Sequence, residues 1–128
     1  MKQLQRILHV DDVPSIRVVT RISLEKLGGY QVLSCASAEE ALSQVGEFAP
    51  NLLLLDVMLP EVDGVTLLRQ LATLVDLQQI PVVLLTGHLE PSRLAELESL
   101  GVRCVLQKPF NPLQLAARLK DIWEADQR

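Results

Sequence analysis

Five polar side chains follow short apolar segments of the chain, at positions where they can meet in one site. They are three carboxylates, one hydroxyl and one amine: Asp11, Asp12, Asp56, Thr86 and Lys108. Two carboxylates about 4 Å apart repel each other by roughly 4 kcal/mol at an effective dielectric constant near 20, so three acids in one site require a compensating cation. Oxygen ligands with open positions for water and phosphate suit a hard divalent ion, and Mg2+ fits this pattern best.

The chemistry that suits this set of groups is phosphoryl transfer. Asp56 is a candidate carboxylate nucleophile toward phosphorus, which gives an acyl phosphate, and a bound metal stabilises both this attack and its reversal by water. Lys108 supplies a positive charge for a phosphoryl oxygen, and Thr86 supplies a hydroxyl donor for the same group. Taken singly, each residue also fits an ordinary turn, cap or solvated surface position. What is specific is that the five residues follow four different apolar segments, each of which is a candidate β-strand.

These side chains can meet because short strands alternate with helices along the whole chain. The strands are predicted at Arg6–Val10, Gln31–Cys35, Leu52–Leu55, Pro81–Leu85 and Val102–Leu106. The third and fourth are continuously apolar, which is typical of strands buried on both faces of a parallel sheet. Right-handed crossover helices between parallel strands give an open α/β sheet with helices on both faces. Ligands of such sheets bind beyond the carboxyl ends of the strands, where the five polar residues follow.

The helices between these strands are predicted from apolar spacing and from end signals. Three stripes have helical spacing: Ala38, Ala41, Leu42 and Val45; Leu67, Leu68, Leu71, Leu74 and Val75; Leu115, Ala116, Leu119, Ile122 and Trp123. Ser37 and Glu40 form a predicted capping box, and Asn111 before Pro112 is a predicted cap followed by proline in the first turn. Gly28-Gly29 is the predicted end of the first helix.

Composition limits the class of protein. The chain has 128 residues, of which 48% are hydrophobic and 3% aromatic, so one domain with an aliphatic core is expected. The net charge of −4 argues against a general nucleic-acid binder. The polar N-terminus does not fit a signal peptide, and the longest apolar run, Leu52–Leu55, is too short to span a bilayer. Cys35 and Cys104 lie far apart without a CxxC motif, which predicts reduced thiols and a cytoplasmic protein with no direct contact to nucleic acid or membrane.

The motifs around the polar residues resemble the response-regulator receiver domain of two-component signalling. They are Asp11-Asp12, the stretch from Asp56 to Gly64, Thr86-Gly87 and Lys108-Pro109-Phe110, and both their order and their spacing match the family. The resemblance extends from about Ile7 to Trp123. It implies a single doubly wound (βα)5, flavodoxin-like domain over residues 1–128, with a five-stranded parallel sheet of order 2-1-3-4-5.

The same resemblance implies a role for each site residue. Asp56 would accept a phosphoryl group from a histidine kinase or phosphotransfer protein, and Thr86 and Lys108 would contact that group. Asp12 and Asp56 would ligate Mg2+ directly with the Met58 backbone carbonyl, and Asp11 would act largely through water. The family also has a cis peptide before the proline that matches Pro109. Such a domain is a signalling module with slow self-phosphorylation and self-dephosphorylation rather than an enzyme, and it engages an output domain or target through helix 4, strand 5 and helix 5.

One position departs from the family pattern. The family usually has an aromatic residue three positions before the lysine, whose ring turns inward when the threonine moves, and here that residue is Val105. A valine cannot report phosphorylation by ring burial, so we expect coupling through backbone and loop shifts, or weak switching. Met58 and His88 occupy positions that influence access of the hydrolytic water in the family, although a loop histidine is more commonly a bystander.

Two further side chains are assigned to the interior rather than to the chemistry. His9, inside the first strand, is predicted to be a packed or hydrogen-bonded structural residue. Trp123 continues the apolar stripe of the last helix and is predicted to anchor the core.

Two other functions compete with phosphorylation. A protein-interaction module with a receiver fold that no longer depends on phosphorylation is the first, and Val105 is its main support. The second is an aspartate-nucleophile phosphatase of the haloacid-dehalogenase type, which requires a second Asp two positions after the nucleophile. Met58 stands at that position, and the chain is too short for a cap over a substrate, so this interpretation is disfavoured.

Overall fold

The computed structural model of this chain describes residues 3–56, 64–87, 94–108 and 110–127. Five parallel strands form one sheet in the order β2-β1-β3-β4-β5: β1 (Arg6–Val10), β2 (Gln31–Cys35), β3 (Leu52–Asp56), β4 (Val82–Thr86) and β5 (Val102–Gln107). Five helices alternate with them: α1 (Pro14–Gly28), α2 (Ala38–Phe48), α3 (Gly64–Ala72), α4 (Leu94–Ser99) and α5 (Pro112–Asp126). The predicted doubly wound α/β fold and strand order are confirmed.

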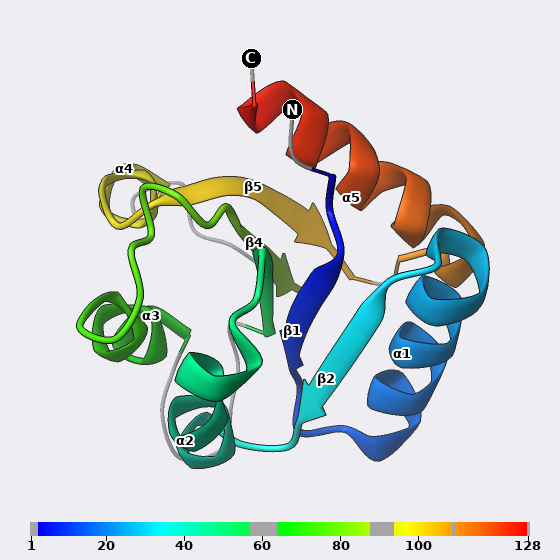
Figure 1. The fold of residues 1–128 in the computed structure, drawn as a ribbon, viewed down its shortest axis with the longest axis horizontal. Helices are drawn as coiled ribbons and strands as arrows, with labels where there is room; N and C mark the ends of the chain where they lie inside the picture. The colour runs from blue at the N-terminus through cyan, green and yellow to red at the C-terminus, as the bar shows by residue number, and fades with distance from the viewer. Residues whose placement is uncertain (1–2, 57–63, 88–93, 109, 128) are drawn as a thin grey trace.

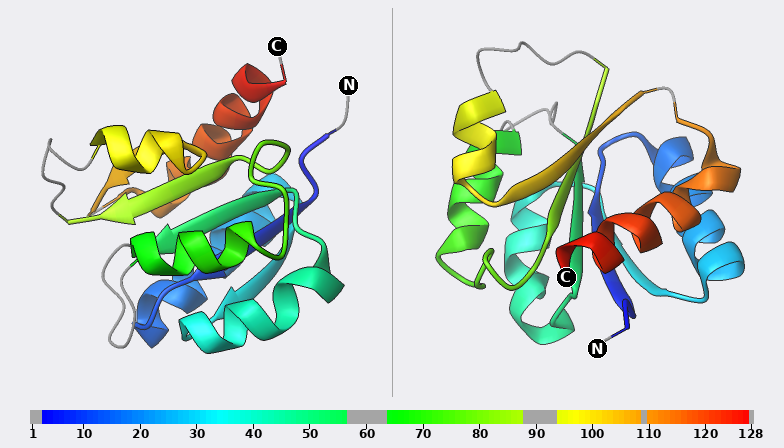
Figure 2. Two further views of the ribbon diagram at one scale, coloured as in Figure 1. Left: turned by 90° about the vertical axis from the view of Figure 1, so that its left-hand side faces the viewer. Right: turned by 90° about the horizontal axis from the view of Figure 1, so that it is seen from above.

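The helices form a layer on each face of the sheet. Helices α1 and α5 cover one face, and α2, α3 and α4 cover the other (Figures 1 and 2). Alternate residues of β3 enter the two cores: Leu53 and Leu55 pack on the α2–α4 side, whereas Leu52 and Leu54 pack on the α1 and α5 side. All four leucines are fully buried, so the continuously apolar pattern reflects burial on both faces.

The predicted helix ends are largely confirmed. The Ser37 hydroxyl accepts a hydrogen bond from the Glu40 amide at 3.2 Å, but the Glu40 carboxylate accepts from the amide of Ala36 (3.0 Å), one residue before the expected partner. The Asn111 side chain accepts from the Leu113 amide at 2.9 Å. Gly29 follows α1 with φ of +70°, a left-handed conformation that glycine adopts without steric cost.

Several predicted boundaries need correction. Strands β3, β4 and β5 each end one residue later than expected, so that Asp56 and Thr86 are the last residues of their strands, and β4 begins at Val82 rather than at Pro81. Helix α3 ends at Ala72, before the last two members of its predicted stripe. There the Thr73 amide and hydroxyl both bond to the Gln70 carbonyl, at 3.2 and 2.7 Å, and Leu74 is 54% exposed. Val75 lies beyond the helix but still packs against the core.

The side chains assigned to the interior, and the two cysteines, are placed as expected. Trp123 is buried in the core, and both cysteines are free thiols. Burial, assisted by the charge of Glu40 and opposed by that of Arg17, raises the pKa of Cys35 to about 12. His9 is fully buried, and burial lowers its pKa to about 4, so its ring is neutral at physiological pH. Neither ring nitrogen of His9 has a hydrogen-bond partner among the described residues; it is packed rather than hydrogen-bonded.

Within the described parts of the chain, no helix combines the length and the apolar character that crossing a bilayer requires.

Candidate functional site

The candidate site lies at the edge of the sheet where the parallel strands end. Asp11 and Asp12 directly follow β1, Asp56 and Thr86 are the last residues of β3 and β4, and Lys108 directly follows β5. The arrowheads of the strands point toward this edge (Figure 2). The Lys108 amide donates to the Thr86 carbonyl at 2.7 Å, which ties the end of β5 to the end of β4. The topology therefore brings all five predicted side chains to one edge.

The three predicted acids form a compact cluster. One carboxylate oxygen from each of Asp11, Asp12 and Asp56 lies within 4.8 Å of the others. Asp11 is fully buried and Asp56 is 3% exposed, whereas Asp12 is half-buried. Buried carboxylates at this spacing repel one another strongly unless positive charge lies beside them.

Lys108 provides part of that positive charge. Its Nζ lies 3.2 Å from Oδ2 of Asp11 and 3.1 Å from Oδ2 of Asp56, so it bridges the two buried acids. Burial by itself lowers the pKa of Lys108, but the hydrogen bonds and charges of Asp56 and Asp11 outweigh it and raise that pKa above 10.5. The lysine is therefore charged at neutral pH, and one lysine against three acids leaves the cluster with net negative charge. A divalent cation would neutralise the remainder.

The loop between β1 and α1 is held by bonds to Asp11. The Asp11 amide donates to the Cys35 carbonyl at 3.1 Å, and Oδ1 of Asp11 accepts from the Val13 amide at 3.0 Å. A side-chain turn of this kind is a common use of aspartate before a helix. Because Oδ2 pairs with Lys108, both carboxylate oxygens of Asp11 already accept hydrogen bonds.

Arg17 belongs to this neighbourhood and was missed by the sequence analysis. Its Nη1 donates to the carbonyl of Asp11 at 2.8 Å from the first turns of α1. The available signal was a basic residue five positions after Asp12, close enough along a helix to reach back to the preceding loop. Nothing in the residue pattern indicates which way that side chain turns.

Some predicted positions lie outside the described residues: Met58, His88 and Pro109. Val105, by contrast, is described. Its side chain is partly buried and packs against the core on the α2–α4 side of the sheet.

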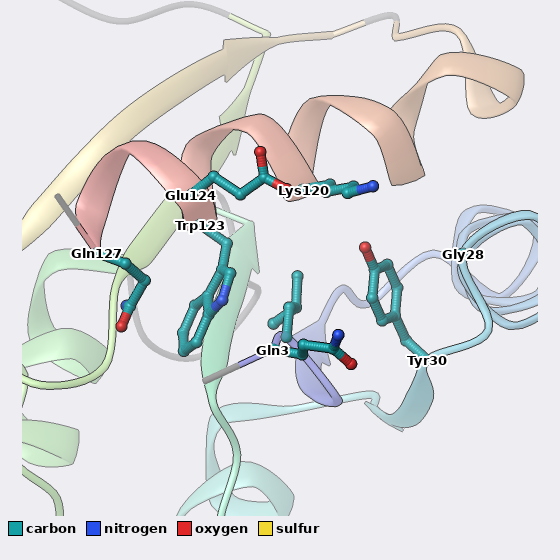
Figure 3. A pocket seen from close by; sticks show the side chains of 8 residues that line it. Gln3, Gly28, Tyr30, Lys120, Trp123, Glu124 and Gln127 are labelled. Carbon is teal, nitrogen blue, oxygen red and sulfur yellow. The ribbon is translucent and has the colours of Figure 1, made fainter. Parts of the chain in front are cut away.

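Two hollows differ in their relation to the site: one contains none of its residues, and the other borders it. One of about 470 Å³ lies between the start of the sheet and the end of α5, with Tyr30 and Trp123 on its walls (Figure 3). It contains none of the clustered acids. The other, of about 310 Å³, borders the site itself because Lys108 forms part of its wall. Its other walls are mainly apolar: Ser15, Ile16, Val19, Phe110 and Pro112.

Comparison with known proteins agrees with this geometry. The family model of the response regulator receiver domain matches residues 7–120. The chain belongs to this family. A phosphorylation-controlled switch is the role of the family, and this receiver domain has the corresponding fold with the acids and the lysine together at one edge.

Individual relatives place the receiver domain among response regulators. It is 37% identical over 119 residues to the alkaline phosphatase synthesis transcriptional regulatory protein PhoP of Bacillus subtilis, covering 92% of this chain and 48% of that protein. It is 36% identical to the phosphate regulon transcriptional regulatory protein PhoB of Escherichia coli, covering 92% of this chain and 51% of that protein. The chain thus spans about half the length of these relatives.

A solved structure gives the same result for the fold. A CheY-like response regulator receiver domain protein from Methanospirillum hungatei superposes with a TM-score of 0.86 at 30% identity, covering 98% of both chains.

Proposed function

We propose that this receiver domain accepts a phosphoryl group on Asp56 from the phosphohistidine of a histidine kinase or phosphotransfer protein, in a Mg2+-dependent reaction. The observation that carries the proposal is the convergence of three carboxylates and Lys108 at one sheet edge. Half-buried Asp12 leaves this cluster open to solvent on one side, from which a phosphodonor can approach.

The donor set fits Mg2+, which prefers carboxylate, carbonyl and water oxygens. Asp12 and Asp56 would ligate the ion directly, together with the backbone carbonyl of Met58. Asp11 would act through water, because its two carboxylate oxygens are already engaged by Val13 and Lys108. When bound, Mg2+ supplies positive charge that stabilises the transferring phosphoryl oxygens.

In the reaction, a carboxylate oxygen of Asp56 attacks the phosphorus of the phosphohistidine. The new O–P bond forms as the P–N bond breaks, and the donor imidazole leaves with the electron pair of that bond. Lys108, 3.1 Å from Asp56, would pair with a phosphoryl oxygen, and the hydroxyl of Thr86 would donate to another. Attack by water on the acyl phosphate later releases inorganic phosphate and restores Asp56. Through this cycle the domain carries a transient phosphorylation signal and does not turn over a substrate as an enzyme does.

Two surfaces suit the partners of this cycle. Helix α1 exposes Val18, Val19 and Ile22 beside the apolar hollow that includes Lys108, a surface that suits a phosphodonor with an apolar helix. The output domain or target protein would bind the face formed by α4, β5 and α5.

The test is incubation of the domain with a small-molecule phosphodonor, with and without Mg2+, followed by intact mass measurement. We expect a phosphate-sized mass gain with Mg2+ that is absent when a chelator is present. Absence of any gain, or a gain that is indifferent to Mg2+, would contradict the proposal.

A second function, interaction with a partner independently of phosphorylation, is favoured by Val105. Its packed, non-aromatic side chain cannot change from exposed to buried as a ring does.

We expect a phosphate mimic to shift the backbone amide resonances across Val102–Leu106 and in the fourth helix, because coupling then runs through the backbone. Shifts confined to the loops of the acidic cluster would instead favour the second function.

A further inference from the structure

Arg17 holds the peptide group that joins the two adjacent acids of the site. Its Nη1 donates to the Asp11 carbonyl at 2.8 Å, and that carbonyl belongs to the peptide between Asp11 and Asp12. The side chain is half-buried and reaches back from α1 over the loop that follows β1. A charged donor to a carbonyl is a stronger and more directional contact than a neutral one.

This contact matters because the two acids are held differently. The Asp11 carboxylate is fixed by the Val13 amide and by Lys108. No hydrogen bond or ion pair of the Asp12 carboxylate is found in the part of the chain that the structure describes, and Asp12 is half-buried. The direction of Asp12 therefore depends on its backbone, which begins at the peptide bonded to Arg17.

We propose that Arg17 is a positioning residue for the phosphotransfer reaction, which orients the Asp11–Asp12 peptide so that the Asp12 carboxylate faces the cation. This inference rests on the proposed function. Arg17 touches neither the phosphoryl group nor the cation; it acts through the backbone of the residues that do.

Loss of the Arg17 charge and loss of its contact with the Asp11 carbonyl predict opposite changes in the affinity for Mg2+. The positive charge of Arg17 extends over the carboxyl ends of β1 and β2, where it adds to the lowering of the His9 pKa and opposes the rise of the Cys35 pKa. If Arg17 acted only through this charge, its loss would make the site more negative and Mg2+ would bind more tightly. If it positions Asp12, its loss lets the ligand reorient and Mg2+ binds less tightly.

The experiment compares Arg17→Met, Arg17→Lys and Arg21→Met with the unmodified domain. Arg21 is one turn further along α1, exposed and paired with Glu25, so its loss removes the same charge without touching the loop. Mg2+ titrations followed by backbone amide shifts give the dissociation constants. Loss of an outer partner of a metal ligand typically weakens metal binding by 10–100-fold. We expect about tenfold weaker binding for Arg17→Met, a smaller loss for Arg17→Lys, and a change under about twofold for Arg21→Met.

Two further readouts separate positioning from general damage. In the metal-free protein, the amides of Asp12 and Val13 should exchange their hydrogens faster in Arg17→Met than in Arg21→Met. At saturating Mg2+, the phosphorylation rate of Arg17→Met should return to near that of the unmodified domain, because only the Mg2+ requirement has changed.

Equal or tighter Mg2+ binding by Arg17→Met would overturn the inference. If Arg17→Met does not fold, Arg17→Lys decides, because it keeps the charge but replaces the guanidinium whose Nη1 bonds the Asp11 carbonyl. Unchanged affinity for Mg2+ then rejects positioning, and weaker affinity supports it. Failure of the unmodified domain to bind Mg2+ or to become phosphorylated would reject the proposed function itself. A working unmodified domain with an indifferent Arg17 rejects only this inference.

Discussion

Replacing Asp56 with asparagine is expected to abolish phosphorylation and to leave the domain folded. The amide has nearly the same shape as the carboxylate but is a poor nucleophile toward phosphorus, so no acyl phosphate forms. Stability should not fall, because the change removes one of three clustered negative charges and an amide oxygen can still accept the hydrogen bond from Lys108. We expect the free energy of unfolding to stay equal or to rise by about 1 kcal/mol.

The measurements are intact mass after incubation with a small-molecule phosphodonor and Mg2+, and urea unfolding without the phosphodonor. Asp121→Asn is a matched control, because Asp121 is exposed on α5 and is not one of the clustered acids. The control should be labelled like the unmodified domain. A phosphate-sized gain that persists in Asp56→Asn would show that another residue accepts the group, and large destabilisation would show that the Asp56 carboxylate is structurally required.

The sequence was sufficient for the fold and for the convergence of the site because both depend on simple patterns. Continuously apolar residues in β3 identify a strand buried on both faces, and a parallel strand of this kind places its next polar residue at a common edge. Once the strands are correctly ordered, Asp56 and Lys108 lie at the same end of the sheet, at the ends of the two strands that flank β4, and the long lysine side chain brings its Nζ within 3.1 Å of Oδ2 of Asp56.

The features that the sequence could not predict depend on where side chains point and on local hydrogen bonds that compete with continuation of a helix. Arg17 has the composition of a solvated helix residue, and only the path of its guanidinium makes it a partner of Asp11. Leu74 continues an apolar stripe, yet the helix ends before it, since the Thr73 hydroxyl bonds locally to Gln70. His9 has no polar partner among the described residues, so its neutral state follows from burial that periodicity alone does not reveal.

Replacing Lys108 with methionine is expected to cause the largest loss of stability among changes at the site. Methionine keeps much of the apolar stem but removes the charge that bridges Asp11 and Asp56, whose side chains are 0% and 5% exposed. Removing one partner of a buried pair typically costs about 3–5 kcal/mol, because it leaves an uncompensated buried charge. Since Lys108 itself is 24% exposed, we expect a loss of about 2–3 kcal/mol at pH 7, measured by urea unfolding with a chelator present.

The pH dependence of this loss has a defined sign. The pKa of Lys108 is raised above 10.5 in the folded protein by Asp56 and Asp11, although burial opposes the shift. A group with a raised folded pKa contributes its full stabilisation below its unfolded pKa and loses it as the pH rises through the folded value. The difference in free energy of unfolding between the unmodified domain and Lys108→Met should therefore stay constant from pH 7 to about 10 and shrink above 10.5.

Lys120→Met provides the control for this experiment, because Lys120 is exposed on α5 and has no ion pair among the described residues. Its free energy of unfolding should change by no more than about 0.5 kcal/mol, the usual range for surface substitutions. Equal stabilities of Lys108→Met and Lys120→Met would mean that water, rather than the lysine, compensates the buried acids. In that case the cluster would be open enough to hydrate both carboxylates, and its requirement for a cation would be correspondingly weak.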